Sequence, residues 1–137
     1  MTTSDSDVSH GLDQLFTAID TKDTETFLSF LTDNATFRFG SAPAVSGKEV
    51  IRDAVESFFS SIASSRHEVA NVLRHEALQV CEGEVTYRRL DGSTLSLPFT
   101  NVFEFDGQLI RHYKVYIDIG PLYRTTREAG MPPSGPN

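Results

Sequence analysis

The last strand-like segment of the chain carries an acidic side chain in a setting that indicates acid–base chemistry. Asp118 ends the run Val115-Tyr116-Ile117-Asp118, in which apolar and polar residues alternate. Because side chains along a strand point to opposite faces in turn, Asp118 shares a face with Tyr116 and Lys114. If that face lines an apolar cavity, the loss of water would raise the pKa of the carboxyl and suit it to proton transfer. The alternative is a strand-end aspartate that accepts backbone N–H groups or pairs with Lys114.

An amide and a phenol on earlier strand-like segments are further catalytic candidates. Asn101 shares a face with Phe99, Phe103 and Phe105, and an amide on so aromatic a face needs a hydrogen-bond partner when it is buried. This amide could donate to a substrate carbonyl or a developing oxyanion, or it could bond internally to the backbone or to Tyr87. Tyr87 could offer its phenol to the same pocket, although a strand tyrosine more often only packs.

Aromatic residues supply the expected lining of the pocket. The chain has 10 Phe, 4 Tyr and no Trp, which suits a pocket for an apolar, ring-bearing ligand and equally an ordinary core. We expect Phe16, Phe39 and Phe103 to line the pocket, with Tyr116 also in contact with substrate. His67 begins a strand and can reach the pocket from another wall, although a position at the surface or in an interface is the alternative.

The histidines and the single cysteine show no pattern of a metal site. The four histidines, at positions 10, 67, 75 and 112, lack ligand spacings such as His-x-His. Cys81 has no basic neighbour in the sequence and is expected to be a small packing residue. A Gly-rich phosphate loop and a dinucleotide fingerprint are also absent from the sequence. We therefore expect neither a metal nor an organic cofactor.

Three helices and five strands are needed to position these residues. Apolar residues at helical spacing predict helices over about 9–21, near Phe27–Leu31, and over about 47–63, with Ser46 and Glu49 as a capping box for the third. Alternating residues predict a strand over 35–40. Four further strands are expected over about 66–74, 77–90, 93–105 and 108–120.

The turns between these strands indicate a meander. Asp91-Gly92 and Asp106-Gly107 separate alternating runs, and Asp-Gly is a strong signal for a hairpin with a type I′ turn. Glu82-Gly83 is expected to make a bulge or bend within a strand. The helices can bury their apolar faces only against one side of the sheet. The sequence therefore predicts an α+β fold, in which a cone-shaped, curved antiparallel sheet packs over three N-terminal helices and encloses a pocket.

Length and composition fit one domain with flanking segments. The 137 residues predict a single domain over 9–123, a disordered N-terminus over 1–8 and a loose tail over 124–137. A net charge of −7 argues against nucleic-acid and membrane partners, because phosphate binding needs clustered Lys and Arg. The first residues show no secretory signal, so we expect a cytoplasmic protein. Val115, Ile117 and Ile119, placed on the outer face of the sheet, predict a homodimer.

Three stretches of the chain also carry a family resemblance: 31–37 with 46–51, 97–107, and 113–118. Their order and spacing resemble the nuclear-transport-factor-2-like superfamily, in particular its SnoaL-like branch, over about residues 10–122. That branch includes polyketide cyclases, and ketosteroid isomerase and limonene epoxide hydrolase are related to it. The resemblance implies the same α+β fold. It says less about function, because this fold hosts many activities.

The resemblance also assigns roles to particular positions. Asp118 matches the acid–base aspartate of the SnoaL-like cyclases, and Asn101 falls where ketosteroid isomerase has an oxyanion-stabilising acid. The isomerase base would fall near Phe39, where this chain has no carboxylate. Val85 and Tyr87 replace the arginine and aspartate of limonene epoxide hydrolase, which argues against its mechanism.

Two functions follow as alternatives. The first is a cofactor-free enzyme that acts on a hydrophobic small molecule by isomerisation, cyclisation, dehydration or hydrolysis. Asp118 is the acid or base, and Asn101 with Tyr87 or Tyr116 polarises the reacting oxygen. The second is a non-catalytic domain of the same fold that binds a small molecule or serves as a dimeric scaffold.

Overall fold

The computed structural model describes the backbone over residues 5–123 and the side chains over residues 11–123. The order of elements is α1 (Asp5–Asp20), α2 (Thr24–Ser29), β1 (Leu31–Phe39), β2 (Val45–Ser46), α3 (Lys48–Ser60), β3 (Ser64–His75), β4 (Leu78–Arg88), β5 (Thr94–Asp106), β6 (Leu109–Tyr116) and a 3₁₀ turn, η1 (Gly120–Tyr123). Helix α1 begins at Asp5, inside the segment expected to be disordered. Residues 1–4 and the tail 124–137 lie outside the described residues.

The strands form one curved sheet in the order β2-β1-β6-β5-β4-β3. Strands β3 to β6 make the predicted antiparallel meander. Strand β1 differs from the prediction, because it pairs with β6 in parallel, with Phe37 opposite Tyr113. The α+β fold class is confirmed, with a mixed sheet in place of an antiparallel one. This order puts the first long strand beside the last, so residues far apart in sequence share one face.

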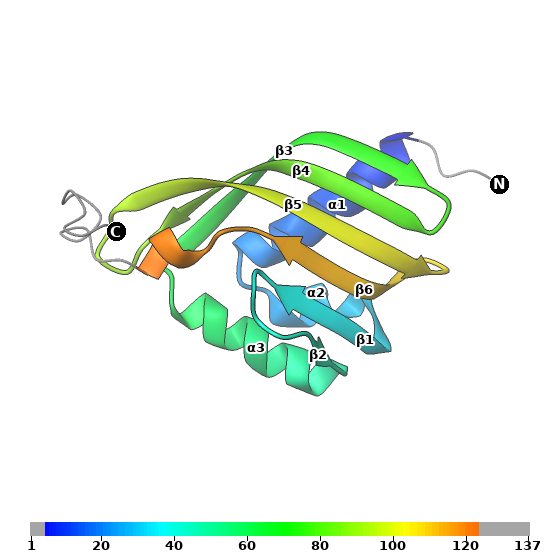
Figure 1. The fold of residues 1–137 in the computed structure, drawn as a ribbon, viewed down its shortest axis with the longest axis horizontal. Coiled ribbons are helices and arrows are strands. Elements are labelled where there is room, and N and C mark those ends of the chain that lie inside the picture. Colours follow the sequence, from blue (N-terminus) through cyan, green and yellow to red (C-terminus); the bar gives the residue numbers. More distant parts are fainter. Residues whose placement is uncertain (1–4, 124–137) are drawn as a thin grey trace.

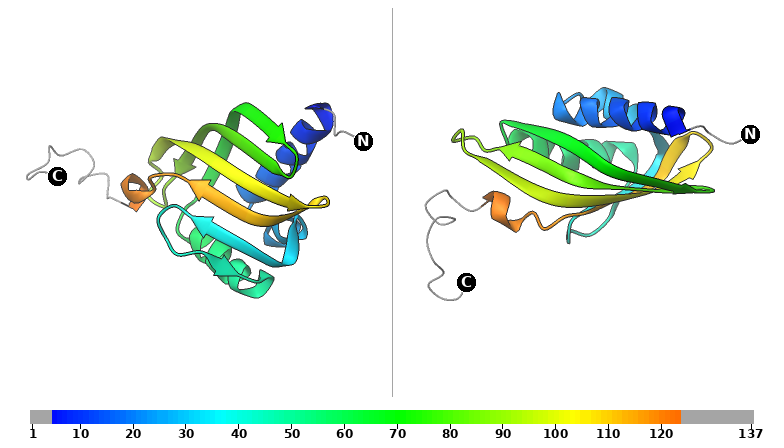
Figure 2. Two further views of the ribbon diagram at one scale, coloured as in Figure 1. Left: turned by 45° about the vertical axis from the view of Figure 1, so that its right-hand side comes forward. Right: turned by 90° about the horizontal axis from the view of Figure 1, so that it is seen from above.

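The helices all cover the same face of this sheet. Figure 1 shows the sheet lying across α1, and Figure 2 shows from above that α1 and α2 lie on one side of the strands. Helix α1 packs on β3, and α3 packs on β1. Every fourth residue of α3 (Ile51, Val55 and Phe59) is buried against the sheet, as the helical spacing of its apolar residues requires. No helix among the described residues has the length and apolar content needed to cross a membrane.

The hairpin turns form where the sequence predicts them, but with other geometries. Gly92 and Gly107 have positive φ angles of 90° and 64°, whereas Asp91 and Asp106 do not. A type I′ turn needs positive φ at both central residues, so neither turn is of that type. The backbone N–H of Arg89 bonds Ser93 O at 2.7 Å, which closes a three-residue loop ending on Gly92. The Ser46 capping box is likewise absent, because Gly47 is the N-cap of α3 and Ser46 pairs with Thr36 in the sheet.

A bulge between β3 and β4 adds to the curvature of the sheet. The register shifts between Val69 and Asn71, so Ala70 is the extra residue, opposite Glu82-Gly83. The bend therefore lies where the sequence predicts it, but the inserted residue belongs to the neighbouring strand. A Cβ atom on Gly83 would lie 1.9 Å from the carbonyl oxygen of Glu68. Glycine is needed here because the backbone of β3 approaches too closely for any side chain.

Candidate functional site

A cavity of about 220 Å³ lies between the concave face of the sheet and the helices. Most of its lining is apolar, and six phenylalanines dominate it: Phe27, Phe37, Phe39, Phe58, Phe59 and Phe99. Four lining residues carry polar groups: His67, Tyr87, Asn101 and Tyr113. An apolar enclosure with a few convergent polar groups is the usual form of a small-molecule site.

The imidazole of His67 is held by an aspartate from another element. Nδ1 of His67 lies 2.6 Å from Oδ1 of Asp20, and the backbone N–H of His67 donates to Oδ2 at 2.9 Å. The hydroxyl of Ser65 donates to Oδ1 at 2.7 Å. Asp20 is the last residue of α1, and His67 lies on β3. The contact of α1 with β3 therefore builds a carboxylate–imidazole pair at the wall of the cavity.

The carboxylate of this pair is ionised at neutral pH. Burial acts to raise the pKa of Asp20, but the hydrogen bonds from His67 and Ser65 outweigh it and hold the pKa below its usual value. An ionised carboxylate beside Nδ1 favours the tautomer with the proton on Nδ1. Nε2, which bonds to none of the described residues, is then the nitrogen left to accept a proton from a ligand.

Two aromatic rings fix the plane of this imidazole. Phe16 stacks on His67 with ring centroids 4.6 Å apart and an angle of 18° between planes. Phe99 meets the imidazole edge-on, with ring centroids 5.2 Å apart. The side chains of His67 and Asp20 are only 10% and 21% exposed. An oriented, largely desolvated imidazole is suited to take up or give a proton.

The two tyrosines in the cavity are neutral donors. Burial raises the pKa of Tyr87 and of Tyr113 well above the ordinary value of 10.0. Neither phenol hydroxyl bonds to any other residue within the described part of the chain, so both are free to bond a ligand. A protonated phenol in such a site donates a hydrogen bond to an oxygen, as an oxyanion-stabilising group does.

Asn101 adds an amide to the same wall. Its residue is 2% exposed, and Oδ1 has no hydrogen-bond partner among the described residues. A ligand carbonyl cannot pair with this buried acceptor. The donor of the same amide, Nδ2, bonds to none of the described residues and is the atom left to bond a ligand oxygen. Its strand neighbour Cys81 is fully buried, and burial raises the pKa of that thiol to about 12. Cys81 is therefore an uncharged packing residue, as expected.

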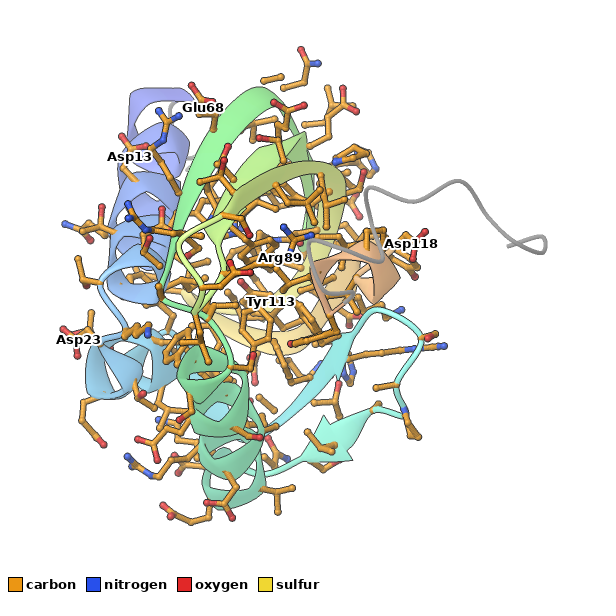
Figure 3. All side chains as sticks on the ribbon, turned by 90° about the vertical axis from the view of Figure 1, so that its left-hand side faces the viewer. Asp13, Asp23, Glu68, Arg89, Tyr113 and Asp118 are labelled. Carbon is orange, nitrogen blue, oxygen red and sulfur yellow. The ribbon has the colours of Figure 1, made fainter. Side chains whose placement is uncertain are left out.

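Asp118 lies outside this site, and the predicted orientation of the last strand is wrong. Val115 and Ile117 line the cavity, so Tyr116 and Asp118 point to the opposite face, where Tyr116 is 53% exposed. Figure 3 shows Tyr113 directed into the interior and Asp118 at the outside, beside η1. The Asp118 carboxylate is exposed and accepts the backbone N–H of Gly120 at 3.3 Å. It has the alternative role foreseen for it, and Tyr116 does not line the cavity.

The same reversal changes the predicted lining and the predicted interface. Phe39 lines the cavity as expected, but Phe16 and Phe103 do not. Phe16 stacks on the ring of His67, and the ring of Phe103 packs on that of Tyr113 with centroids 4.7 Å apart. Val115 and Ile117 face inward, so they supply no apolar strip on the outer face. A homodimer is still a prediction, but these two residues no longer support it.

Asp20 is the functional candidate that sequence reasoning missed. It is 47 residues from His67, and no spacing rule connects the two. One signal was present: an aspartate at the C-terminal end of a helix opposes the helix dipole. Such a residue needs a compensating partner elsewhere, and here the partner is the His67–Ser65 strand segment.

An open groove adjoins the cavity. The two share four lining residues: Phe39, Ala42, Ala54 and Phe58. Tyr123 of η1 lies in the groove, with its hydroxyl 3.0 Å from that of Ser61, the C-cap residue of α3. Arg89 anchors η1 by donating to the carbonyl oxygens of Pro121 and Leu122, each at 3.0 Å. The side of the cavity next to η1 is therefore the side that lies beside this groove.

Solved structures of other proteins share this fold. An NTF2-like protein from Anabaena variabilis has a TM-score of 0.74 at 22% identity, covering 86% of this chain and 95% of that one. An NTF2-like protein of unknown function from Burkholderia pseudomallei has a TM-score of 0.76 at 13% identity, covering 90% and 97%. An LEH-like epoxide hydrolase from M. tuberculosis has a TM-score of 0.68 at 14% identity, covering 80% and 81%. At these identities the similarity establishes the fold alone.

Comparison of the sequence with protein families gives the assignment. No functionally curated protein matches the sequence. The model of the SnoaL-like domain matches residues 12–113, which run from the first buried leucine of α1 to Tyr113 in the cavity. This range includes both members of the carboxylate–imidazole pair and the three other polar residues of the cavity. On this match, the chain belongs to the SnoaL-like domain family.

Proposed function

We propose that this protein is a cofactor-free acid–base enzyme that acts on a hydrophobic small molecule, with His67 as the group that takes up and returns a proton. The observation that supports it most is the pairing of His67 with Asp20 at the wall of an apolar cavity. The reaction classes that need only such a group are isomerisation, cyclisation, dehydration and hydrolysis.

The proposed roles follow from the chemistry of each side chain. Nε2 of His67 accepts a proton from the substrate, and the Asp20 carboxylate stabilises the imidazolium that forms. Tyr87 donates a hydrogen bond to a substrate oxygen near the reacting bond, and Asn101 donates to an oxygen at the other end of the substrate. Asp20 does not touch the substrate in this account, so it is a positioning residue. Asp118 has no part in the mechanism.

A non-catalytic binding domain is the second candidate. Apart from the His67–Asp20 pair, the polar groups of the cavity are neutral at physiological pH, because burial raises the pKa of both tyrosines. A lining of this kind favours binding of a neutral ligand whether or not a reaction follows. The fold alone does not decide between them, because one fold can host both catalytic and binding functions.

Proton exchange at carbon distinguishes the two candidates without knowledge of the natural substrate. In D₂O, an acid–base enzyme removes a C–H proton next to a carbonyl and returns deuterium. We expect the protein to accelerate exchange in 2-tetralone or indan-2-one, two bicyclic ketones sized for the cavity, as followed by proton NMR. The Asp118→Asn variant is expected to exchange at the wild-type rate, because that carboxylate lies outside the cavity.

Two results would contradict the enzyme proposal. If either ketone binds but both exchange no faster than in buffer alone, the result would favour the binding domain. Loss of exchange in Asp118→Asn with unchanged thermal unfolding would return the acid–base role to the residue that the sequence first suggested.

A further inference from the structure

The four polar residues of the cavity fall into two groups on neighbouring strands. His67 lies opposite Val85 on β4, and Tyr87 follows two residues later on the same face. Asn101 lies opposite Val115 on β6, and Tyr113 precedes it by two residues. Side chains at such diagonal positions are within reach of one another. The cavity therefore has an imidazole–phenol end and an amide–phenol end.

These two ends are too far apart for one functional group to reach both. Along β4, Val85 is the partner of His67 and Cys81 is the partner of Asn101, which is an offset of four residues. That offset amounts to about 13 Å along the strands, with about 10 Å more across two strand spacings. Phe99, two residues before Asn101 on the same face, contacts His67 and fills the wall between the ends.

The charges at the cavity select against an anionic ligand. No Lys or Arg is among the described residues that line it. The Asp20 carboxylate beside His67 is a negative charge that acts to raise the pKa of both tyrosines. A carboxylate or sulfonate would lose its hydration here without gaining a cation, which is strongly unfavourable.

The size of the cavity limits the number of rings. An engineered apolar cavity of about 150 Å³ accommodates one benzene ring. The volume of about 220 Å³ found here leaves room for a substituted single ring or two fused rings. Three or four fused rings exceed this volume.

We propose that the ligand is a neutral, flat molecule of one or two fused rings with a polar group at each end. A hydroxyl or activated C–H meets Nε2 of His67, and a carbonyl oxygen meets the Asn101 amide and the Tyr113 phenol. This inference rests on the proposed function in assigning Nε2 of His67 as the proton acceptor. When the O–H or C–H bond breaks, its proton moves to Nε2. The electron pair passes through the conjugated ring to the carbonyl oxygen, where the amide and phenol stabilise the charge.

A set of four bicyclic probes tests the two ends separately. Tetralin has neither group, 1-tetralone has the carbonyl, 5,6,7,8-tetrahydro-2-naphthol has the hydroxyl, and 6-hydroxy-1-tetralone has both at opposite ends. We expect each group to tighten binding about tenfold in titration calorimetry, which is typical of one hydrogen bond that completes a buried partner. The gain from the carbonyl should vanish in Asn101→Leu, and the gain from the hydroxyl should vanish in His67→Phe.

Further probes and variants act as controls. Tyr116→Phe, on the opposite face of the sheet, should bind all four probes as the wild type does. Anthrone, with three rings, and 5,6,7,8-tetrahydro-2-naphthoate, an anion, should each bind at least tenfold more weakly than 1-tetralone. If Asn101→Leu fails to fold, Asn101→Ala removes the same amide and answers the same question.

The outcomes separate this inference from the proposed function. Equal affinity for all four probes, or a carbonyl gain that survives loss of the Asn101 amide, would overturn the two-ended ligand. Tighter binding of anthrone or of the anion would overturn the limit on size or charge. If the probes behave as expected but the ketones do not exchange, the ligand assignment stands and the enzymatic function fails. If the ketones exchange but the probes do not differ as expected, the enzymatic function stands and the ligand assignment fails.

Discussion

Replacing His67 with glutamine is expected to lower the rate of ketone exchange by about 10²–10⁴-fold, the usual contribution of a positioned general acid or base. Glutamine has similar size and can still bond Asp20, but it cannot take up a proton at neutral pH. The measurement is the initial rate of deuterium incorporation, compared with wild type at equal ketone saturation. A variant that exchanges at the wild-type rate while remaining folded would exclude His67 as the proton acceptor.

Asp20→Asn provides the companion test, because it removes charge and leaves the shape of the side chain. The pKa of Asp20 is lowered in the folded protein from an ordinary value of 3.8. A carboxyl with a lowered folded-state pKa stabilises the protein above its unfolded pKa, and this stabilisation is lost as pH falls through the folded value. Urea unfolding should therefore show wild type more stable than Asp20→Asn at pH 6, with the difference shrinking below about pH 4. A constant difference across that range would contradict the ionised pair.

Replacing Gly83 with alanine is expected to lower the free energy of unfolding by about 1–3 kcal/mol, the typical cost of forcing extra atoms into a packed site. The new Cβ would lie 1.9 Å from the Glu68 carbonyl oxygen and 2.9 Å from the Val69 Cα. These atoms are backbone, so β3 itself must shift. His67 lies one residue before Glu68 on that strand, so the displacement should also disturb its contact with Asp20.

Gly11→Ala is the matched control for this change. Gly11 lies within α1, and a Cβ there meets no described atom within 4 Å. Alanine in a helix interior is favoured over glycine by about 0.5–1 kcal/mol, so this variant should be more stable than wild type. Thermal and urea unfolding of both variants measure the contrast. Equal stability of Gly83→Ala and wild type would contradict the close approach of β3 and β4 at the bulge.

The local elements were predictable because their signals are local. Helical spacing of apolar residues identified α1 and α3, and alternation with Asp-Gly turns identified the β3–β6 meander. The parallel pairing of β1 with β6 was not predictable in this way, since a strand pattern does not encode its partner. Turn geometry also depended on more than the Asp-Gly dipeptide, which indicated a two-residue turn. The structure has a three-residue loop that ends on Gly92 and is closed by the hydrogen bond from Arg89 N–H to Ser93 O.

The orientation of the last strand explains why Asp118 was wrongly expected to face the cavity. Alternation divides its residues into one set with Val115 and Ile117 and another with Tyr116 and Asp118, but it does not say which set is inside. Assigning the apolar set to a dimer interface left the polar set for the cavity. Burial of apolar side chains in the protein's own core is the commoner outcome, and the structure follows it.

Asn101 was found from the sequence because its amide interrupts an aromatic strand face, Tyr87 because its phenol could join the same pocket, and His67 because it begins a strand that can reach the pocket. Their partners were less accessible to this reasoning. Asp20 comes from a helix end and meets His67 only through tertiary packing of α1 on β3, and Tyr113 is recognisable as a lining residue only once the inner face of β6 is known.

The protonation state of the His67 ring tests the central claim most directly. In ¹⁵N-labelled protein, long-range ¹H–¹⁵N correlation spectra distinguish the two ring nitrogens at a pH where the imidazole is neutral. The Asp20 contact predicts a proton on Nδ1, a bare Nε2, and a shift of the Nε2 resonance when 6-hydroxy-1-tetralone binds. A proton on Nε2, or an Nε2 resonance unmoved by the bound probe, would mean that this nitrogen does not face the ligand as a base.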